Sequence, residues 1–172
     1  MSHQAIERLY SDHDAMLKLL RTQSEFSAEQ TVIDDYRKIL VLAAASYLEH
    51  QISEALVEYV SRKSAADSAV VAMVRTKVIK RQYHTYFDWE KKKAGTFFSL
   101  LGEDVGEGIK AATKNGELQT ALDAFLELGY LRNCLVHQNF VSYSFEKTPE
   151  EVWKLYLQAK KFVEHVEAAL RA

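Results

Sequence analysis

Apolar positions along this chain recur mostly three or four residues apart, which is the spacing of one face of an α-helix. An apolar stripe over residues 3–23 predicts the first helix, and its members are Ile6, Leu9, Met16, Leu17 and Leu20. The 172 residues include only six glycines and one proline, so few positions break a helix. The pattern therefore predicts an all-α chain with long helices.

A second helix is predicted to run to about residue 62 and to be the central helix of the fold. Two capping-box patterns, Ser27–Gln30 and Thr31–Asp34, mark candidate starts, because each places a hydroxyl three residues before a side chain that can cap in return. No residue between Ile39 and Leu48 is charged. A helix that is apolar nearly all round is a buried one.

The remaining segments also show helical periodicity, with two interruptions. Further helices are predicted over residues 65–82, 84–101, 117–137 and 149–169. In the first of these, the side chains expected to point inward are Val70, Met73, Val74 and Val78. The glycine-containing stretch 103–116 is predicted to be irregular with one short helical turn at most, and residues 138–147 are predicted to lie extended on the bundle.

The last helix has the clearest predicted start. Thr148 suits the N-cap, Pro149 the first helical position and Glu151 the third. A threonine and a glutamate at this spacing cap each other's backbone N–H groups, and proline is well placed where no N–H is needed. We therefore expect a capping box at Thr148.

Length and composition indicate one globular domain. The chain is 48% hydrophobic and 27% charged, as is usual for a globular protein, and single domains commonly run to about 100–200 residues. A chain of this size can bury a core without disulfides or metals. We expect residues 1–172 to form one bundle of about five to six helices.

The cysteine content and the N-terminus bear on the cellular compartment. Cys134 is the one cysteine, which excludes an intrachain disulfide and a cysteine-based zinc site and suits a reducing cytoplasm. The longest apolar run, Ile39–Ala45, is far shorter than the roughly 20 residues of a membrane span. The polar N-terminus lacks the apolar core of a signal peptide. We predict a cytoplasmic protein with no membrane partner.

The segment from Leu128 to Asn139 carries the candidate chemistry. It reads Leu-Gly-Tyr-Leu-Arg-Asn-Cys-Leu-Val-His-Gln-Asn. Asn133 and His137 are four residues apart and share a helix face, and the long side chain of Arg132 reaches the same side. A structural alternative stays open, because cations also suit the C-terminal end of a helix dipole.

This pattern of arginine, a polar residue and a following histidine resembles the signature of the HEPN superfamily. The stretches Leu131–His137 and Ala43–Glu49 are most similar to its RiboL-PSP-HEPN branch. The resemblance covers about residues 31–170 and implies a HEPN-like helical bundle. Gln138 departs from the pattern, because relatives often have a small residue after the histidine, and this departure affects the expected geometry of the following loop.

The resemblance implies a metal-independent endoribonuclease without a cofactor, whose catalytic residues are Arg132, Asn133 and His137. In such an enzyme the RNA 2′-hydroxyl attacks the neighbouring phosphorus. Histidine moves protons near neutral pH, and arginine grips phosphate oxygens. The resemblance also implies that the site is composed across a homodimer. It implies a toxin or antiviral-defence effector that cuts RNA, with tRNA as one candidate target. Its expected partner is an antitoxin or a defence-system protein.

Glu49 and His50 interrupt the apolar central helix and are candidates for a supporting role. Glu49 would pair with Arg132 or influence the protonation of His137 through its charge. The alternative is a partly exposed polar edge or a pair with a purely structural role.

Residues 75–93 form a second candidate region, because seven basic side chains face two acidic ones there and aromatic residues interleave. Such a mixture suits single-stranded RNA through phosphate contacts and base stacking. The lysines and the arginine proposed to bind RNA are Lys77, Lys80, Arg81, Lys91, Lys92 and Lys93. The alternative is a pair of helix ends whose aromatic residues anchor the core and whose lysines are solvated; we prefer it for the aromatic residues and leave it open for the charges. Because the whole chain has a net charge of −2, RNA affinity requires such a local patch.

Two other functions stay open at this point. One is a non-catalytic HEPN module that binds RNA or a protein, in which case alanine at His137 would leave activity in cells unchanged. The other is a toxin neutralised by a nucleotidyltransferase partner.

Overall fold

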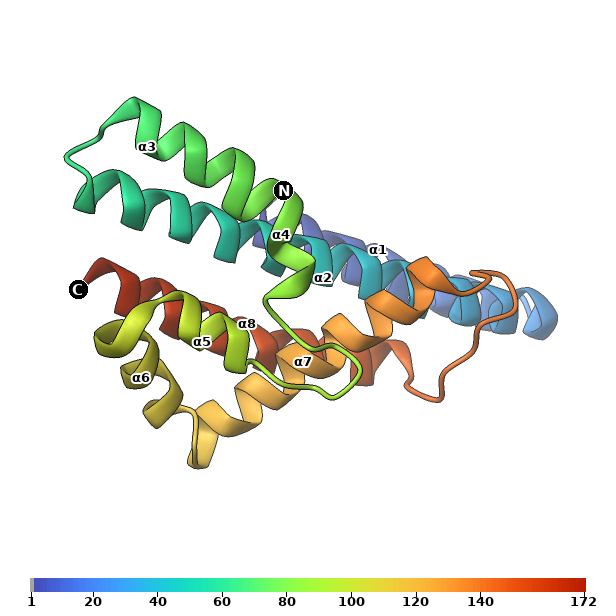
Figure 1. Ribbon diagram of the computed structural model, residues 1–172. Coiled ribbons are helices and arrows are strands. Elements are labelled where there is room, and N and C mark those ends of the chain that lie inside the picture. Colours follow the sequence, from blue (N-terminus) through green and yellow to red (C-terminus); the bar gives the residue numbers. More distant parts are fainter. Residues whose placement is uncertain (1) are drawn as a thin grey trace.

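The computed structural model describes residues 2–172, apart from the side chain of Arg81. These residues form an all-α fold without a named strand (Figure 1). The helical elements are α1 His3–Thr22, α2 Phe26–Lys63, α3 Ser68–Met73, the π-helix Val74–Ile79, α4 Lys80–Gln82, the 3-10 turn Tyr83–Thr85, α5 Gly95–Leu100, α6 Gly102–Ala112, α7 Gly116–His137 and α8 Pro149–Arg171. Within residues 2–172, no helix is long and apolar enough to cross a membrane.

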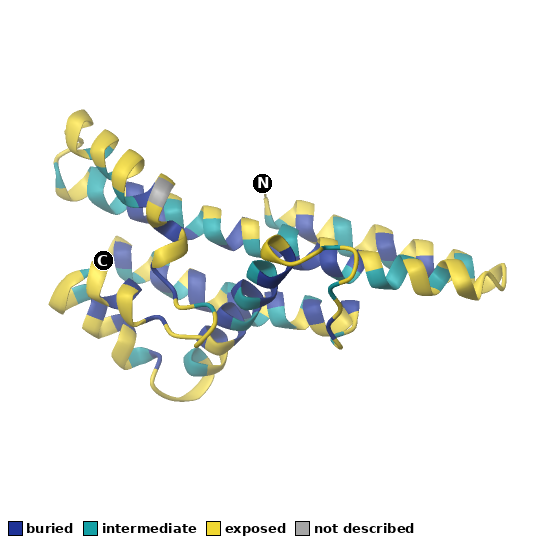
Figure 2. Ribbon diagram, turned by 45° about the vertical axis from the view of Figure 1, so that its right-hand side comes forward, coloured by how far each residue is buried: buried dark blue, intermediate teal, exposed yellow. Residues whose placement is uncertain are grey.

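Helix α2 is the central helix, as its uncharged run predicts. Its side chains Leu40, Val41, Ala44 and Ile52 are fully buried, and it packs against α1, α7 and α8. Burial is concentrated where α2, α7 and α8 meet (Figure 2). Burial of large apolar side chains contributes about 1.5–3 kcal/mol each, so this contact region holds the fold together.

The predicted start of α2 is wrong. The helix begins at Phe26, and no side chain caps its N-terminus. The hydroxyls of both capping-box candidates lie inside the helix, where Thr31 donates back to the carbonyl of Ser27. Ser24 has a positive φ of 59°, so the chain reverses within three residues of the end of α1 and enters α2 before either candidate box is reached.

The segment predicted as one helix over residues 65–82 is helical but contains a π-helix, Val74–Ile79. Asp67 caps α3, because its carboxylate accepts from the N–H groups of Ala69 and Val70. Val70 and Met73 are exposed, against the prediction that they point inward. Helix α3 extends beside the end of α2 and away from the rest of the bundle (Figure 1), so it has no partner on its outer side.

The helix predicted over residues 84–101 is wrong in its first half and correct over residues 95–100, which form α5. A tight loop occupies residues 86–94, closed by the backbone pairing of Asp88 with Lys93, and α5 begins only at Gly95. The stretch predicted as irregular, 103–116, instead contains α6. Gly106 explains the difference, because a Cβ at this position would collide with the carbonyl of Phe98. The glycine thus permits close packing of α6 on α5 rather than breaking the helix.

Helices α7 and α8 agree with prediction. Helix α7 covers Gly116–His137, and α8 starts with the expected capping box between Thr148 and Glu151. The chain between them is not helical and lies on the bundle in part: Phe145 is buried, whereas Val141 is 84% exposed. Helix α7 therefore ends at His137, at the edge of the core.

Candidate active site

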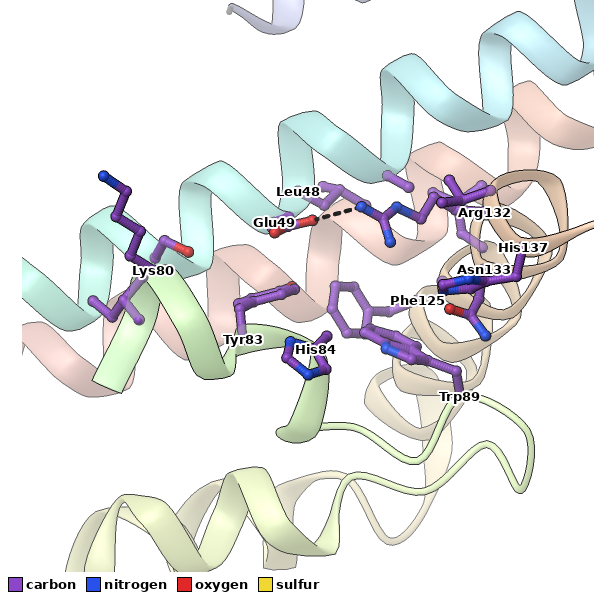
Figure 3. A pocket seen from close by; sticks show the side chains of 16 residues that line it. Leu48, Glu49, Lys80, Tyr83, His84, Trp89, Phe125, Arg132, Asn133 and His137 are labelled. Carbon is purple, nitrogen blue, oxygen red and sulfur yellow. Dashed lines mark ion pairs between the residues drawn. The ribbon is translucent and has the colours of Figure 1, made fainter. Parts of the chain in front are cut away.

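Arg132, Asn133 and His137 lie together on the last two turns of α7 and line one cavity of about 800 Å³. Helix α2 forms a second wall of this cavity, and the segment from Ile79 to Trp89 forms a third. Figure 3 shows the three α7 side chains at one end of the cavity and Tyr83 and His84 at the other. Arg132 and Asn133 are half-buried and His137 is exposed, so a ligand can reach all three.

Glu49 comes from α2 and faces Arg132 across the cavity. One Nη2 atom of Arg132 lies 3.9 Å from a carboxylate oxygen of Glu49, which is an ion pair without a hydrogen bond. The two side chains are 33% and 38% exposed. A loose, partly solvated pair leaves the guanidinium donors available for phosphate oxygens. The predicted pairing is confirmed, whereas the neighbouring His50 is exposed and does not line the cavity.

Trp89 closes one side of the cavity by packing against a glycine of α7. A Cβ at Gly129 would overlap three ring carbons of the Trp89 indole, so only glycine admits the ring at this depth. Gly129 stands one turn before Asn133 on the same helix. The indole therefore lies beside the motif residues, with Phe125 behind it at a centroid distance of 6.0 Å.

Tyr83 reaches the cavity from the 3-10 turn. Its ring is buried, and burial raises the pKa of its hydroxyl well above the usual value; the charge of Glu49 adds to the increase and that of Arg132 opposes it. The hydroxyl is therefore protonated at all physiological pH values and lies within the electrostatic reach of both residues. It is available as a hydrogen-bond donor toward a ligand.

Comparison with known proteins shows the family of this chain. The model of the RiboL-PSP-HEPN family matches the chain over residues 6–172. The chain belongs to this family. No curated protein and no solved structure gives a significant match. The match covers nearly all of the helical chain, including the Arg132–His137 segment of α7.

The predicted RNA-binding lysines of this HEPN chain have different surroundings. Lys80 lines the cavity and Lys77 is exposed on the π-helix. Lys92 pairs with Glu127 and lies 4.9 Å from the ring centre of Tyr130, and Lys91 lies 3.7 Å from Asp88. Lys93 is exposed within the tight loop, and the side chain of Arg81 lies outside the described part of the chain.

The aromatic residues of the same region divide into two groups. Tyr86 and Phe87 are buried in the core, as preferred from the sequence, whereas Tyr83, His84 and Trp89 line the cavity. The sequence contains one indication of the Trp89 contact, because Gly129 lies inside an apolar helix at a position where no turn requires a glycine. Its meaning depends on Trp89, which lies 40 residues earlier in the chain.

Lys38 anchors the chain that follows His137. Its side chain is 5% exposed, and its ammonium group donates to the carbonyls of Phe140 and Val141 at 2.9 and 3.2 Å. A buried lysine needs such partners, because an unpaired charge in the core is costly. The position of the loop behind the HEPN motif is therefore set by α2.

Among the described residues, no group of three or more His, Cys, Asp or Glu is placed to hold a metal ion.

Proposed function

We propose that this HEPN protein is a metal-independent endoribonuclease. Family membership supports a nuclease or another RNA-related function. The observation that carries the finer proposal is the meeting of His137, Arg132 and Asn133 on one accessible cavity. A proton-transferring group and a fixed cation are the two components that cleavage by a 2′-hydroxyl requires.

Each residue has a distinct role in this chemistry. The 2′-oxygen attacks the adjacent phosphorus, its proton passes to a base, and the 5′-oxygen of the next nucleotide leaves with a proton from an acid. His137 serves as one of these proton carriers. Arg132 binds the nonbridging oxygens and stabilises the charge that builds on them in the transition state. Asn133 orients the phosphate or the imidazole. The products carry a 2′,3′-cyclic phosphate and a 5′-hydroxyl.

A second copy of the chain would complete the site. The reaction has two proton transfers, and the motif supplies one histidine for them. His137 is exposed, and the apolar side chains of Val136 and Val141 beside it in sequence are 52% and 84% exposed. A homodimer that covers this end of α7 would bury these side chains and bring two histidines to one phosphate. The protein would then act as a toxin or antiviral-defence effector on cellular RNA, with tRNA as one candidate target.

The test is cleavage of total RNA and of purified tRNA in the presence of EDTA. Wild-type protein is compared with His137→Ala and Arg132→Ala. His50→Ala is the matched control, because His50 is an exposed histidine of α2 that does not line the cavity. We expect cleavage by wild type and by the control, and loss of about 100-fold or more in each motif variant.

The outcomes separate the candidate functions. Cleavage that persists in His137→Ala refutes the assigned role of the motif. Absence of cleavage by all four proteins, with RNA still bound, favours a non-catalytic RNA-binding module. Light scattering measures the mass in solution, and a monomer that cuts at full rate would refute the composite site.

A further inference from the structure

The wall of the cavity opposite the HEPN motif is built from a distorted helical segment. The π-helix Val74–Ile79 leads directly into Lys80 and then into the 3-10 turn Tyr83–Thr85. A π-helix is rare, and its turns are frequently found at functional sites. Four residues at the end of this π-helix and just after it line the cavity: Ile79, Lys80, Tyr83 and His84.

The aromatic part of this wall is held rigidly. The two backbone hydrogen bonds between Asp88 and Lys93 measure 2.9 and 3.0 Å. The Asp88 carboxylate also accepts from the N–H of Lys91 at 3.0 Å. These bonds fix the loop that carries Trp89, and the indole fits the notch left by Gly129. A ligand therefore meets a surface that is already ordered and does not have to supply the free energy of ordering it.

The size and lining of the cavity suit a nucleotide. Its volume of about 800 Å³ lies within the range of roughly 300–1,000 Å³ that is common for small-molecule sites. Phosphate-binding chemistry, from Arg132, stands at one end of the cavity, and the rings of Tyr83 and His84 stand at the other (Figure 3). The indole of Trp89 lines the same cavity beside Asn133. Unpaired RNA bases are commonly bound on aromatic side chains and read along their hydrogen-bonding edges.

We propose that Tyr83, His84 and Trp89 form a base-binding subsite that takes a guanine next to the cleaved phosphate, with Glu49 reading its edge. This inference rests on the proposed ribonuclease function. Glu49 lines the same cavity and makes no hydrogen bond to Arg132. Its carboxylate presents two adjacent acceptors. Among the four RNA bases, only guanine has two adjacent N–H donors, at N1 and N2, on its Watson–Crick edge.

Cleavage of chimeric oligonucleotides tests the selectivity. Each is a DNA strand with one ribonucleotide, so that only one phosphate can be attacked by a 2′-hydroxyl. One set varies the base of the ribonucleotide, and a second set varies the base that follows it. A bidentate contact to a base discriminates by roughly 5- to 150-fold. We expect a guanine preference of at least about fivefold in kcat/KM in one of the two sets.

Glu49→Gln distinguishes base reading from general support of the site. Glutamine offers one acceptor and one donor in place of two acceptors, so the guanine preference should disappear whatever happens to the overall rate. Glu54→Gln is the matched control, because Glu54 is an exposed glutamate on the same helix and pairs with Arg75 at 3.5 Å. Equal cleavage of all four bases by wild type, or a preference that Glu49→Gln leaves intact, overturns the proposal.

A binding measurement separates the subsite from catalysis. All-DNA oligonucleotides cannot be cleaved by this chemistry, and quenching of Trp89 fluorescence in a Trp153→Phe background reports their binding. We expect guanine-containing strands to bind at least about fivefold more tightly than adenine-containing ones. His84→Phe should keep the affinity, since it keeps an aromatic ring, and His84→Ala should lose it. Selective binding without cleavage of RNA would refute only the ribonuclease, whereas cleavage without base selectivity would refute only the subsite.

Discussion

The contact between Gly129 and Trp89 makes a sharp prediction about stability. In Gly129→Ala, the added methyl group overlaps the indole. Either the core is strained by this close contact, or the indole leaves its place between Phe87 and Phe125. Overpacking of a core costs about 1–3 kcal/mol, and lost burial of an aromatic ring costs a similar amount. Alanine at the same time favours the helix by about 1 kcal/mol over glycine. The expected net loss is therefore about 0–2 kcal/mol.

Gly108→Ala is the matched control for this substitution. Gly108 lies inside α6, and a Cβ there meets nothing within 4 Å. This variant should gain about 0.5–1 kcal/mol from helix propensity alone. Because the propensity contribution is common to both variants, their difference isolates the steric cost, about 1–3 kcal/mol.

Urea denaturation followed by circular dichroism measures both free energies of unfolding. In a Trp89→Leu background, Gly129→Ala should lose its penalty, as expected for two residues in contact. The reasoning is refuted if Gly129→Ala and Gly108→Ala change stability equally, or if the penalty at Gly129 is the same with leucine at position 89.

Three further predictions concern other parts of the fold. Lys38→Met removes two hydrogen bonds to the chain after His137; we expect a loss of about 1–2 kcal/mol and faster amide exchange in residues 138–147, and unchanged exchange would contradict the anchoring role. Burial lowers the pKa of His13, so the imidazole binds a proton more readily in the unfolded chain than in the folded one. The free energy of unfolding should therefore fall as pH drops below about 6.5. His13→Phe keeps the stacking on Tyr36 and should make the free energy of unfolding depend less on pH over that range than in wild type. Thr148→Ala removes one half of the capping box and should cost about 1 kcal/mol in thermal unfolding, whereas Thr96→Ala, at an exposed position of α5, should cost less than about 0.5 kcal/mol.

Prediction from sequence succeeded where local patterns and burial point to the same structure. The uncharged run of α2 requires a buried helix, and the capping box at Thr148 is satisfied within four residues. Prediction failed between Tyr83 and Gly116, where the outcome depends on distant partners. Aromatic periodicity over 84–101 imitates a helix, but Phe87 and Trp89 pack onto Phe125 of α7 and hold the chain in a loop. Gly106 looks like a helix breaker and acts as a packing contact.

The sequence by itself determined the all-α class, the central helix and the motif Arg132–His137, because periodicity, charge and spacing are properties of contiguous residues. The tertiary structure alone decided what surrounds the motif. It brings Glu49 to Arg132 across 83 positions of chain, leaves His50 outside the cavity, and places Tyr83, His84 and Trp89 in the same cavity as the catalytic candidates. Such neighbours follow from helix packing and from one missing Cβ at Gly129, and neither is encoded in any local stretch of the chain.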